Sequence, residues 1–351
     1  MVFNRRGLTL SAAAVIILSA ALLAQKKDEK KQSDAQKKET LEIVKIADAA
    51  AAGQPAGNDL GLMWAHEDYL KATGNKEYVP FTVTFDTSKV PSGSNVALYW
   101  RVVGKDAAAP APAATGKKDD KDKDKDKKGA SRFAYEDINF IAAPAMGRIS
   151  RAFTVSAGTY DVYVVLREQA STQKNAPAPK VSVIKQTLTV PDFWTPDLTT
   201  SSVIVASRIE PLNAPLSPNE QIERPYALGM MEIVPALDTK FTTKSELSIF
   251  MLIYNPKTDP MNKPDVTVEY NFYQKPAGAA EKFFNKTSPQ ALNATTLPPA
   301  FDMSLGHQLQ TGQAVPLGSF PPGDYRLEIK VTDKLAMKTV TRDVNFTVTA
   351  G

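Results

Sequence analysis

The stretch "FPPGDYRLEIKVTD", residues 320–333, combines a turn with a strand. A glycine is followed two residues later by a tyrosine, and apolar and polar side chains alternate from there on. A second stretch, "SAGTYDVYVVLRE", residues 156–168, has the same order of features. Because alternation with a period of two residues is typical of strands that bury one face, both stretches predict a strand of an antiparallel sheet.

Two residue pairs, Gly158 with Tyr160 and Gly323 with Tyr325, predict a corner at which the chain crosses between two packed sheets. The glycine allows the sharp bend of the backbone. The tyrosine ring inserts at the edge of the core while its hydroxyl bonds to a backbone group upstream. We expect these four residues to maintain the fold and to take no part in binding.

Alternating segments recur throughout the chain, and prolines (25) outnumber glycines (18), which favours short strands over long helices. The sequence therefore predicts an all-β protein with two tandem antiparallel β-sandwiches, over residues 77–190 and 198–350. The stretch "PDFWTPD", residues 191–197, reads as the linker between them. An insertion rich in Ala and Pro and then in Lys and Asp, residues 105–131, has no apolar pattern and is expected to be disordered.

The N-terminal segment predicts export. Arg5 and Arg6 precede an apolar run that ends at Ala24, as in a signal peptide of residues 1–24. An uncleaved membrane anchor is the alternative. A charged, disordered tether over 25–40 and a short irregular or helical lead-in over 41–76 follow. We expect a periplasmic or extracellular protein that contacts a membrane only through an uncleaved N-terminal segment or the basic tether.

The two corners, each followed by an alternating strand and a closing strand, resemble immunoglobulin-like and fibronectin type III-like modules. The "PPGDY" form of the second corner is most similar to tandem modules of poorly characterised exported bacterial proteins. The likeness covers about residues 77–190 and 198–350. It implies the fold and an exported location, and it specifies no activity.

The sequence has few residues suited to catalysis. Cysteine is absent and histidine occurs only at His66 and His307, so a thiol nucleophile or a multi-histidine metal site lacks its residues. No nucleophile elbow, phosphate-binding loop or dinucleotide motif is present. The net charge of +4 comes with no basic groove of interleaved aromatics, which argues against nucleic acid. We expect no cofactor, no metal and no enzyme activity.

A binding role is the remaining hypothesis. We expect a protein partner in the cell envelope, held by sandwich edges or by the loops 167–180 and 275–303, with Tyr163 pointing outward. A carbohydrate-binding accessory protein is the alternative, with Trp64, Trp194 and Tyr163 as the aromatic residues that stack on sugars. A hydrolase with an unrecognised carboxylate pair is a lower alternative.

Overall fold

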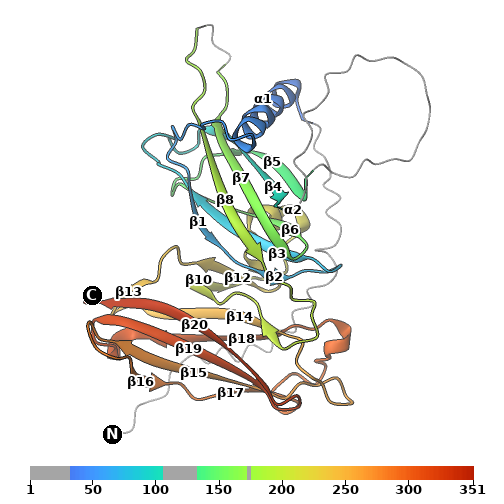
Figure 1. Cartoon of the computed structure of the whole chain (residues 1–351), viewed down its shortest axis with the longest axis vertical. Helices are drawn as coiled ribbons and strands as arrows, with labels where there is room; N and C mark the ends of the chain where they lie inside the picture. Colours follow the sequence, from blue (N-terminus) through green and yellow to red (C-terminus); the bar gives the residue numbers. More distant parts are fainter. Residues whose placement is uncertain (1–31, 106–132, 172–174) are drawn as a thin grey trace, which may run out of the picture.

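The computed structural model describes residues 32–105, 133–171 and 175–351. Strands dominate these residues and helices are few, which confirms the all-β class (Figure 1). The expected signal peptide, residues 1–24, and nearly all of the insertion expected at 105–131 lie outside the described residues. No helix in the described part of the chain is both long and apolar enough to cross a membrane.

The first half of the chain forms two antiparallel sheets. Sheet A has the order β5-β4-β7-β8, and in sheet B the strand β3 pairs with β1, β2 and β6. Alternate residues of both sheets, among them Phe81, Trp100 and Val164, fill the space between them. The strands are β1 (Met63–Glu67), β2 (Leu70–Lys71), β3 (Glu77–Thr84), β4 (Asn95–Gly104), β5 (Tyr135–Ala142), β6 (Arg148–Val155), β7 (Gly158–Glu168) and β8 (Val181–Val190).

The second half forms sheets C and D. Sheet C has the order β11-β12-β10-β14-β18 with β9 beside β14, and sheet D the order β13-β20-β19-β15-β16 with β17 beside β15. The strands are β9 (Thr199–Thr200), β10 (Ile204–Pro211), β11 (Ala227–Leu228), β12 (Met231–Pro235), β13 (Lys240–Thr242), β14 (Glu246–Tyr254), β15 (Val266–Lys275), β16 (Lys282–Lys286), β17 (Gln290–Leu292), β18 (Leu309–Pro316), β19 (Gly323–Asp333) and β20 (Lys338–Thr349). The helical segments are α2 (Pro218–Glu223), η2 (Met303–Leu305) and η3 (Leu317–Ser319).

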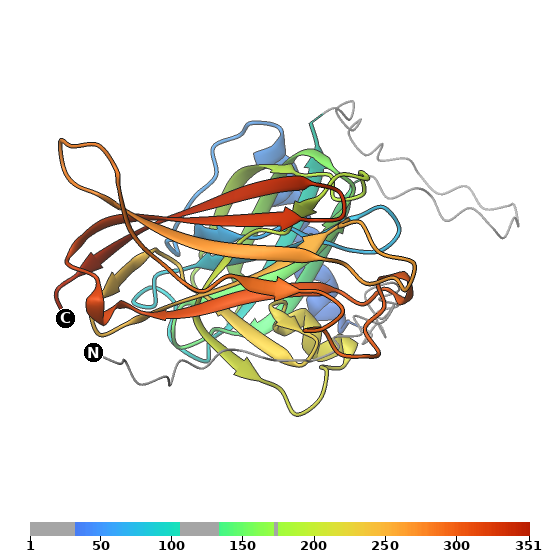
Figure 2. The same cartoon turned by 90° about the horizontal axis from the view of Figure 1, so that it is seen from below.

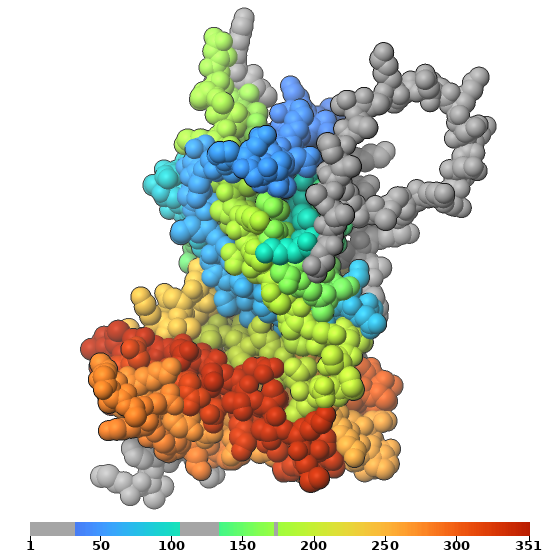
Figure 3. Space-filling view, viewed as in Figure 1, coloured from blue at the N-terminus to red at the C-terminus, as the bar shows by residue number. Residues whose placement is uncertain are grey.

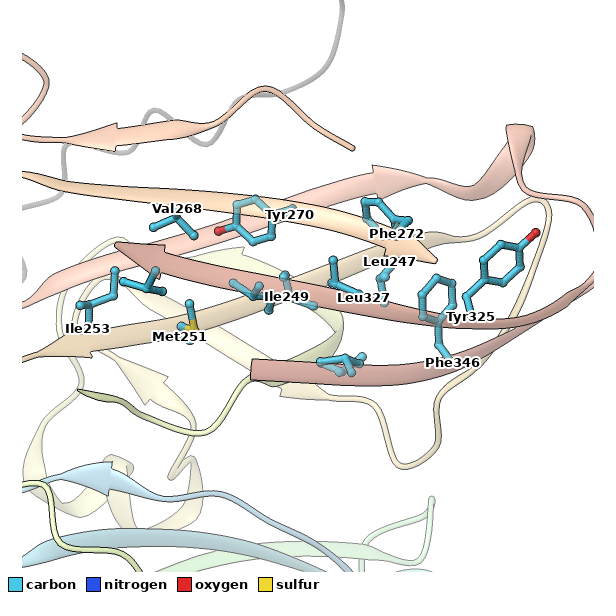
Figure 4. Close-up of a cluster of buried hydrophobic side chains, with 14 of the residues drawn as sticks. Leu247, Ile249, Met251, Ile253, Val268, Tyr270, Phe272, Tyr325, Leu327 and Phe346 are labelled. Atoms are coloured by element: carbon cyan, nitrogen blue, oxygen red, sulfur yellow. The ribbon is translucent and has the colours of Figure 1, made fainter. Parts of the chain in front are cut away.

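The core between sheets C and D follows the alternation of the sequence. Ile249 of β14, Tyr270 of β15 and Leu327 of β19 point into the same layer, which Figure 4 shows edge-on. All strand pairs described in these sheets are antiparallel except β13 with β20, which is parallel.

The two halves are joined by a further apolar layer. Tyr78 of sheet B and Ile204 and Tyr254 of sheet C belong to one buried cluster. The Tyr78 hydroxyl donates to the carbonyl of Pro225 at 3.0 Å, and the backbone N–H of Lys71 donates to the Tyr254 hydroxyl at 3.0 Å. Sheets B and C are therefore packed on both faces, and the halves form one continuous body (Figures 2 and 3).

An amphipathic helix, α1 (Asp34–Ala51), covers the outer face of sheet A (Figure 1). It begins with a capping box in which Ser33 accepts from the backbone of Gln36 while the Gln36 side chain accepts from the backbone of Ser33. Ile43 and Ala47 are buried against Tyr99 and neighbouring apolar residues of the sheet.

This helix corrects the expected N-terminal boundaries. The disordered tether predicted for residues 25–40 is wrong from residue 34 onward, because most charged residues of α1 lie on its outer face while its apolar face is buried. The lead-in predicted for residues 41–76 contains the rest of α1 and also β1 and β2, which are strands of sheet B. An ion pair between the buried side chain of Arg101 and the exposed side chain of Asp48, 2.5 Å apart, fixes the helix to the sheet.

Both predicted corners contain the expected hydroxyl contact. The Tyr160 hydroxyl donates to the carbonyl of Ser156 at 2.9 Å, and the Tyr325 hydroxyl donates to the carbonyl of Pro321 at 2.6 Å. The glycine of each corner has a positive φ, 151° at Gly158 and 155° at the equivalent position of the second corner. Side chains are strained at such φ values, which explains the glycines.

The surroundings of the two tyrosines differ. Tyr325 is 0% exposed, and its ring stacks on Phe346 with 5.3 Å between the ring centroids (Figure 4). Phe320 and Phe284 contact the same ring edge-on. Tyr160 is only half-buried and packs at the border of the core between sheets A and B.

Candidate functional site

Sheet C divides into two arms. The ladder between β10 and β14 runs only from Ile204 with Phe250 to Ala206 with Ser248. Beyond a register shift that follows Ala206, β10 continues to Pro211 paired with β12 alone. Strand β14 meanwhile pairs with β18 along nearly its whole length. The two arms therefore separate after Ala206, and a groove opens between them.

We call this opening the sheet C groove. Its volume is about 1180 Å³, and it is lined by the end of β10, the start of β14, β18 and the connection from β12 to β13. Leu237 is 40% exposed at the groove, where an apolar side chain in water favours contact with a partner. The other apolar lining residues are Ile209, Pro211, Leu212, Met230, Met231, Ala236, Phe241 and Ala314.

The rim of the groove carries both signs of charge. Arg208 forms an exposed ion pair with Glu210, 2.8 Å apart. Asp238 accepts from the backbone N–H of Lys240 at 3.0 Å, and Glu246 accepts from a serine hydroxyl two residues on. Because neither charge dominates, the groove suits a segment with little net charge.

Tyr163 does not lie where we expected it. It points to the outer face of sheet A, as the alternation predicts, but it is only 6% exposed. The ammonium group of Lys185 lies 5.6 Å from the centre of its ring. The prediction of an exposed Tyr163 is therefore wrong, because neighbouring side chains cover this part of the sheet.

The two tryptophans proposed for sugar stacking lie in separate environments. Trp64 stacks on Phe81, with 4.8 Å between ring centroids, and its indole N–H donates to Glu67 at 2.6 Å. Trp194 is 38% exposed, and the Lys71 ammonium lies 4.2 Å from its ring centre. One face of each ring is thus occupied, and the structure does not bring the two residues together into one aromatic platform.

His66 and Asp68 form a buried pair beside the junction of the two halves. Their side chains lie 2.7 Å apart, with 25% and 3% of the side chain exposed. Burial acts to lower the pKa of His66, but the hydrogen bond to Asp68 and the negative charges of Asp68 and Glu67 together outweigh it, and the pKa is raised. Burial raises the pKa of Asp68. No group of three or more His, Cys, Asp or Glu that could hold a metal occurs among the described residues.

Sequence reasoning missed the groove. Its apolar residues lie on four strands, β10, β12, β13 and β18, and on the connections next to them, so only long-range strand pairing brings them together. Local signals were weak: "SRIEPL" ends β10 with a proline, and Leu237 stands between a proline-containing strand end and Asp238.

Neither a protein-family model nor a curated protein matches the sequence. Among solved structures, latent PorU from Porphyromonas gingivalis matches at 9% identity and a TM-score of 0.29, over 87% of this chain and 21% of that one. Trypsin-activated α2-macroglobulin from Escherichia coli matches at 11% identity and a TM-score of 0.23, over 85% and 17%. A family 123 glycoside hydrolase from Clostridium perfringens matches at 12% identity and a TM-score of 0.24, over 44% and 28%.

These three proteins are bacterial, and this chain spans less than a third of the length of each. Scores this low support no conclusion about function.

Proposed function

We propose that this chain is an exported, non-catalytic binding protein of the bacterial cell envelope, built from two immunoglobulin-like sandwiches. It binds an extended segment of a protein partner in the sheet C groove. The export part rests on the basic residues and the apolar run of the N-terminal sequence. The binding part rests on the separation of β10 from β14.

Separated strands favour an extended partner. Where β10 leaves β14, the backbone groups at the start of β14 face the groove instead of a neighbouring strand. An added strand satisfies such groups by main-chain hydrogen bonds, and pockets for alternate side chains supply specificity. An unpaired strand edge beside apolar side chains is the surface that this mode of recognition uses.

The lining defines the chemistry of the partner segment. Ile209, Leu237 and Phe241 offer apolar contacts, which favour a segment with apolar side chains at alternate positions. The mixed charges at the rim, Arg208 and Glu246 among them, disfavour a segment with a large charge of either sign. We therefore propose a short, nearly neutral strand with a period of two residues.

A photo-crosslinking residue at position 237 tests this proposal in the native envelope. The matched control carries the same residue at position 337, because Met337 is apolar and 89% exposed on the hairpin of sheet D. We expect a discrete adduct from position 237 alone, with the partner's crosslinked residue in one short alternating segment. Equal adducts from both positions, or none from position 237, contradict the proposal.

A synthetic peptide of the mapped segment makes the test sharper. Binding by strand addition predicts slower hydrogen exchange at the backbone of Glu246 and Arg208, and a loss of about tenfold in affinity when one bonding amide of the peptide is N-methylated. The variant Leu237→Glu should weaken binding, while Met337→Glu should not. Unchanged affinity on N-methylation contradicts strand addition.

Two results support the alternatives instead. Binding on a glycan array that is lost in Trp194→Ala identifies a carbohydrate-binding protein, because that indole is the most exposed of the described tryptophans. Turnover of an envelope polymer by the purified chain overturns the non-catalytic proposal.

A further inference from the structure

A second cavity lies in the first half, where strand β5 at the edge of sheet A faces strand β6 at the edge of sheet B. We call it the β5–β6 cavity, and its volume is about 320 Å³. Trp100, Tyr135 and Phe153 supply aromatic walls, while Gln221 and Ile222 of α2 lie at its side. This size is at the lower end of the range for small-molecule sites.

The cavity contains a buried indole with no hydrogen-bond acceptor. Trp100 is 1% exposed, and its N–H has no partner within the described residues. A buried N–H donor without a partner costs stability, so such groups are rare in native proteins and call for an explanation. The other two indoles are bonded: Trp64 donates to Glu67, and Trp194 donates to the carbonyl of Lys76.

A buried cation lines the same cavity. Arg151 follows Ile149 by two residues in β6 and therefore points into the sandwich, where it is 4% exposed. Its Nε donates to Asn139 at 2.5 Å and one Nη donates to the carbonyl of Ser150 at 2.7 Å. Both acceptors are neutral, and no carboxylate lies within ion-pair distance of Arg151 in the part of the chain that the structure describes.

These two groups define one ligand chemistry. A guanidinium binds carboxylates through paired N–H groups, and an indole N–H donates to the same kind of oxygen. Burial lowers the pKa of Arg151 by more than the nearby charges of Glu223 and Asp137 raise it, so an anion beside the guanidinium still removes an electrostatic penalty. Asp137 also lines the cavity, and its negative charge disfavours a ligand with two anionic groups.

We propose that the β5–β6 cavity binds a small organic monocarboxylate, whose carboxylate meets Arg151 and the Trp100 N–H and whose flat or apolar body lies against the aromatic walls. This site is independent of the sheet C groove, which lies on the second half. Because α2 belongs to the second half and flanks the cavity, the ligand contacts both halves of the chain.

The indole N–H signals in a ¹H–¹⁵N NMR spectrum of the full chain test the proposal, with benzoate as the probe and benzamide as its uncharged match. We expect the Trp100 signal to shift in a saturable way with benzoate and far less with benzamide. The signals of Trp64 and Trp194 are internal controls, since their N–H groups already have acceptors. They should stay in place.

Two variants test the assignment to this cavity. Arg151→Lys removes the planar, paired donors and should weaken benzoate binding by about tenfold. Ile222→Phe adds bulk beside the cavity from α2, leaves Trp100 and Arg151 intact, and should also weaken binding, so the test does not depend on folding of the Arg151 variant. The proposal is overturned if the Trp100 signal stays unmoved at about 10 mM benzoate, or if all three indole signals move together.

Discussion

The Tyr160 and Tyr325 corners share the same glycine spacing, a similar positive φ at the glycine and the same hydroxyl bond to a carbonyl four residues upstream. They differ in what surrounds the ring. Tyr325 is enclosed by a cluster of phenylalanines, whereas Tyr160 lies half-buried at the border of its core. The motif therefore specifies where the chain bends, and the packing around it decides how much stability depends on the bend.

The largest expected effect is a difference between two truncations. Tyr325→Ala should lower the free energy of unfolding by about 4 kcal/mol, because it leaves a cavity inside the aromatic cluster. Tyr160→Ala should cost about 2 kcal/mol, since this ring is only partly buried. Chemical denaturation of both variants measures the difference. Equal losses would show that the side chains around each ring do not decide how much stability the corner supplies.

The corner of the first half should contribute less to stability than the corner of the second half. The first half has an additional source of stability in the packing of α1 against sheet A. Ile43→Ala should cost about 3 kcal/mol, or release α1 from sheet A, because Ile43 is 0% exposed under the helix. Leu41→Ala is the matched control: Leu41 is 62% exposed on the same helix and should change stability by less than about 0.5 kcal/mol. Denaturation and hydrogen exchange of α1 separate global loss from local release.

A buried carboxyl adds a pH dependence to the first half. Glu77 is 0% exposed, one of its oxygens has no partner among the described residues, and burial raises its pKa to about 7. The neutral form is favoured in the fold, so its contribution is fully present below the unfolded pKa, near 4.5, and is lost as pH rises through 7.

The variant Glu77→Gln should remove this dependence. Because it cannot ionise, it should be more stable than the natural chain by about 2 kcal/mol at pH 8 and nearly equal to it at pH 4.5. Denaturation midpoints of both proteins between pH 4.5 and 8 provide the measurement. Parallel pH curves for the two proteins would show that Glu77 does not titrate in this window.

The smallest expected effect isolates the corner hydroxyls. Tyr325→Phe should cost about 1.5 kcal/mol, because it removes the donor of a part-buried hydrogen bond to the carbonyl of Pro321. Tyr160→Phe should cost about 0.5 kcal/mol, since water can replace the hydroxyl at Ser156. Unaltered denaturation midpoints in both variants would show that the hydroxyl hydrogen bonds do not stabilise the corners.

Local patterns predicted much of the fold. The alternation of Leu327, Ile329 and Val331 in the stretch 320–333 predicted a strand with one buried face, and these residues do line the core between sheets C and D. The pattern also placed Tyr163 on the correct face of sheet A, but it contained no information about the side chains that cover this face. The many charged residues at the start of α1 similarly led to a prediction of disorder. The apolar face of this helix is stabilised only by its contact with sheet A.

The candidate sites were harder to predict, because each depends on contacts between distant segments. The groove exists since β10 leaves β14 after Ala206, and nothing in either strand indicates that the ladder ends there. The burial of Arg151 was easier to predict from the sequence, because a charged residue between Ile149 and Phe153 on the inward face of a strand indicates a buried cation. That the Trp100 N–H has no acceptor depends on the positions of side chains from several strands.

The apolar layer between sheets B and C has a consequence for how such a chain can be altered. A break at residue 197 would leave Tyr78 on one fragment and Tyr254 on the other, and the apolar residues around each would be exposed to solvent. The halves thus differ from independent tandem domains, which can be exchanged, duplicated or expressed singly. Recombination at the boundary between the halves would produce fragments prone to aggregation. The two halves therefore have to be inherited together.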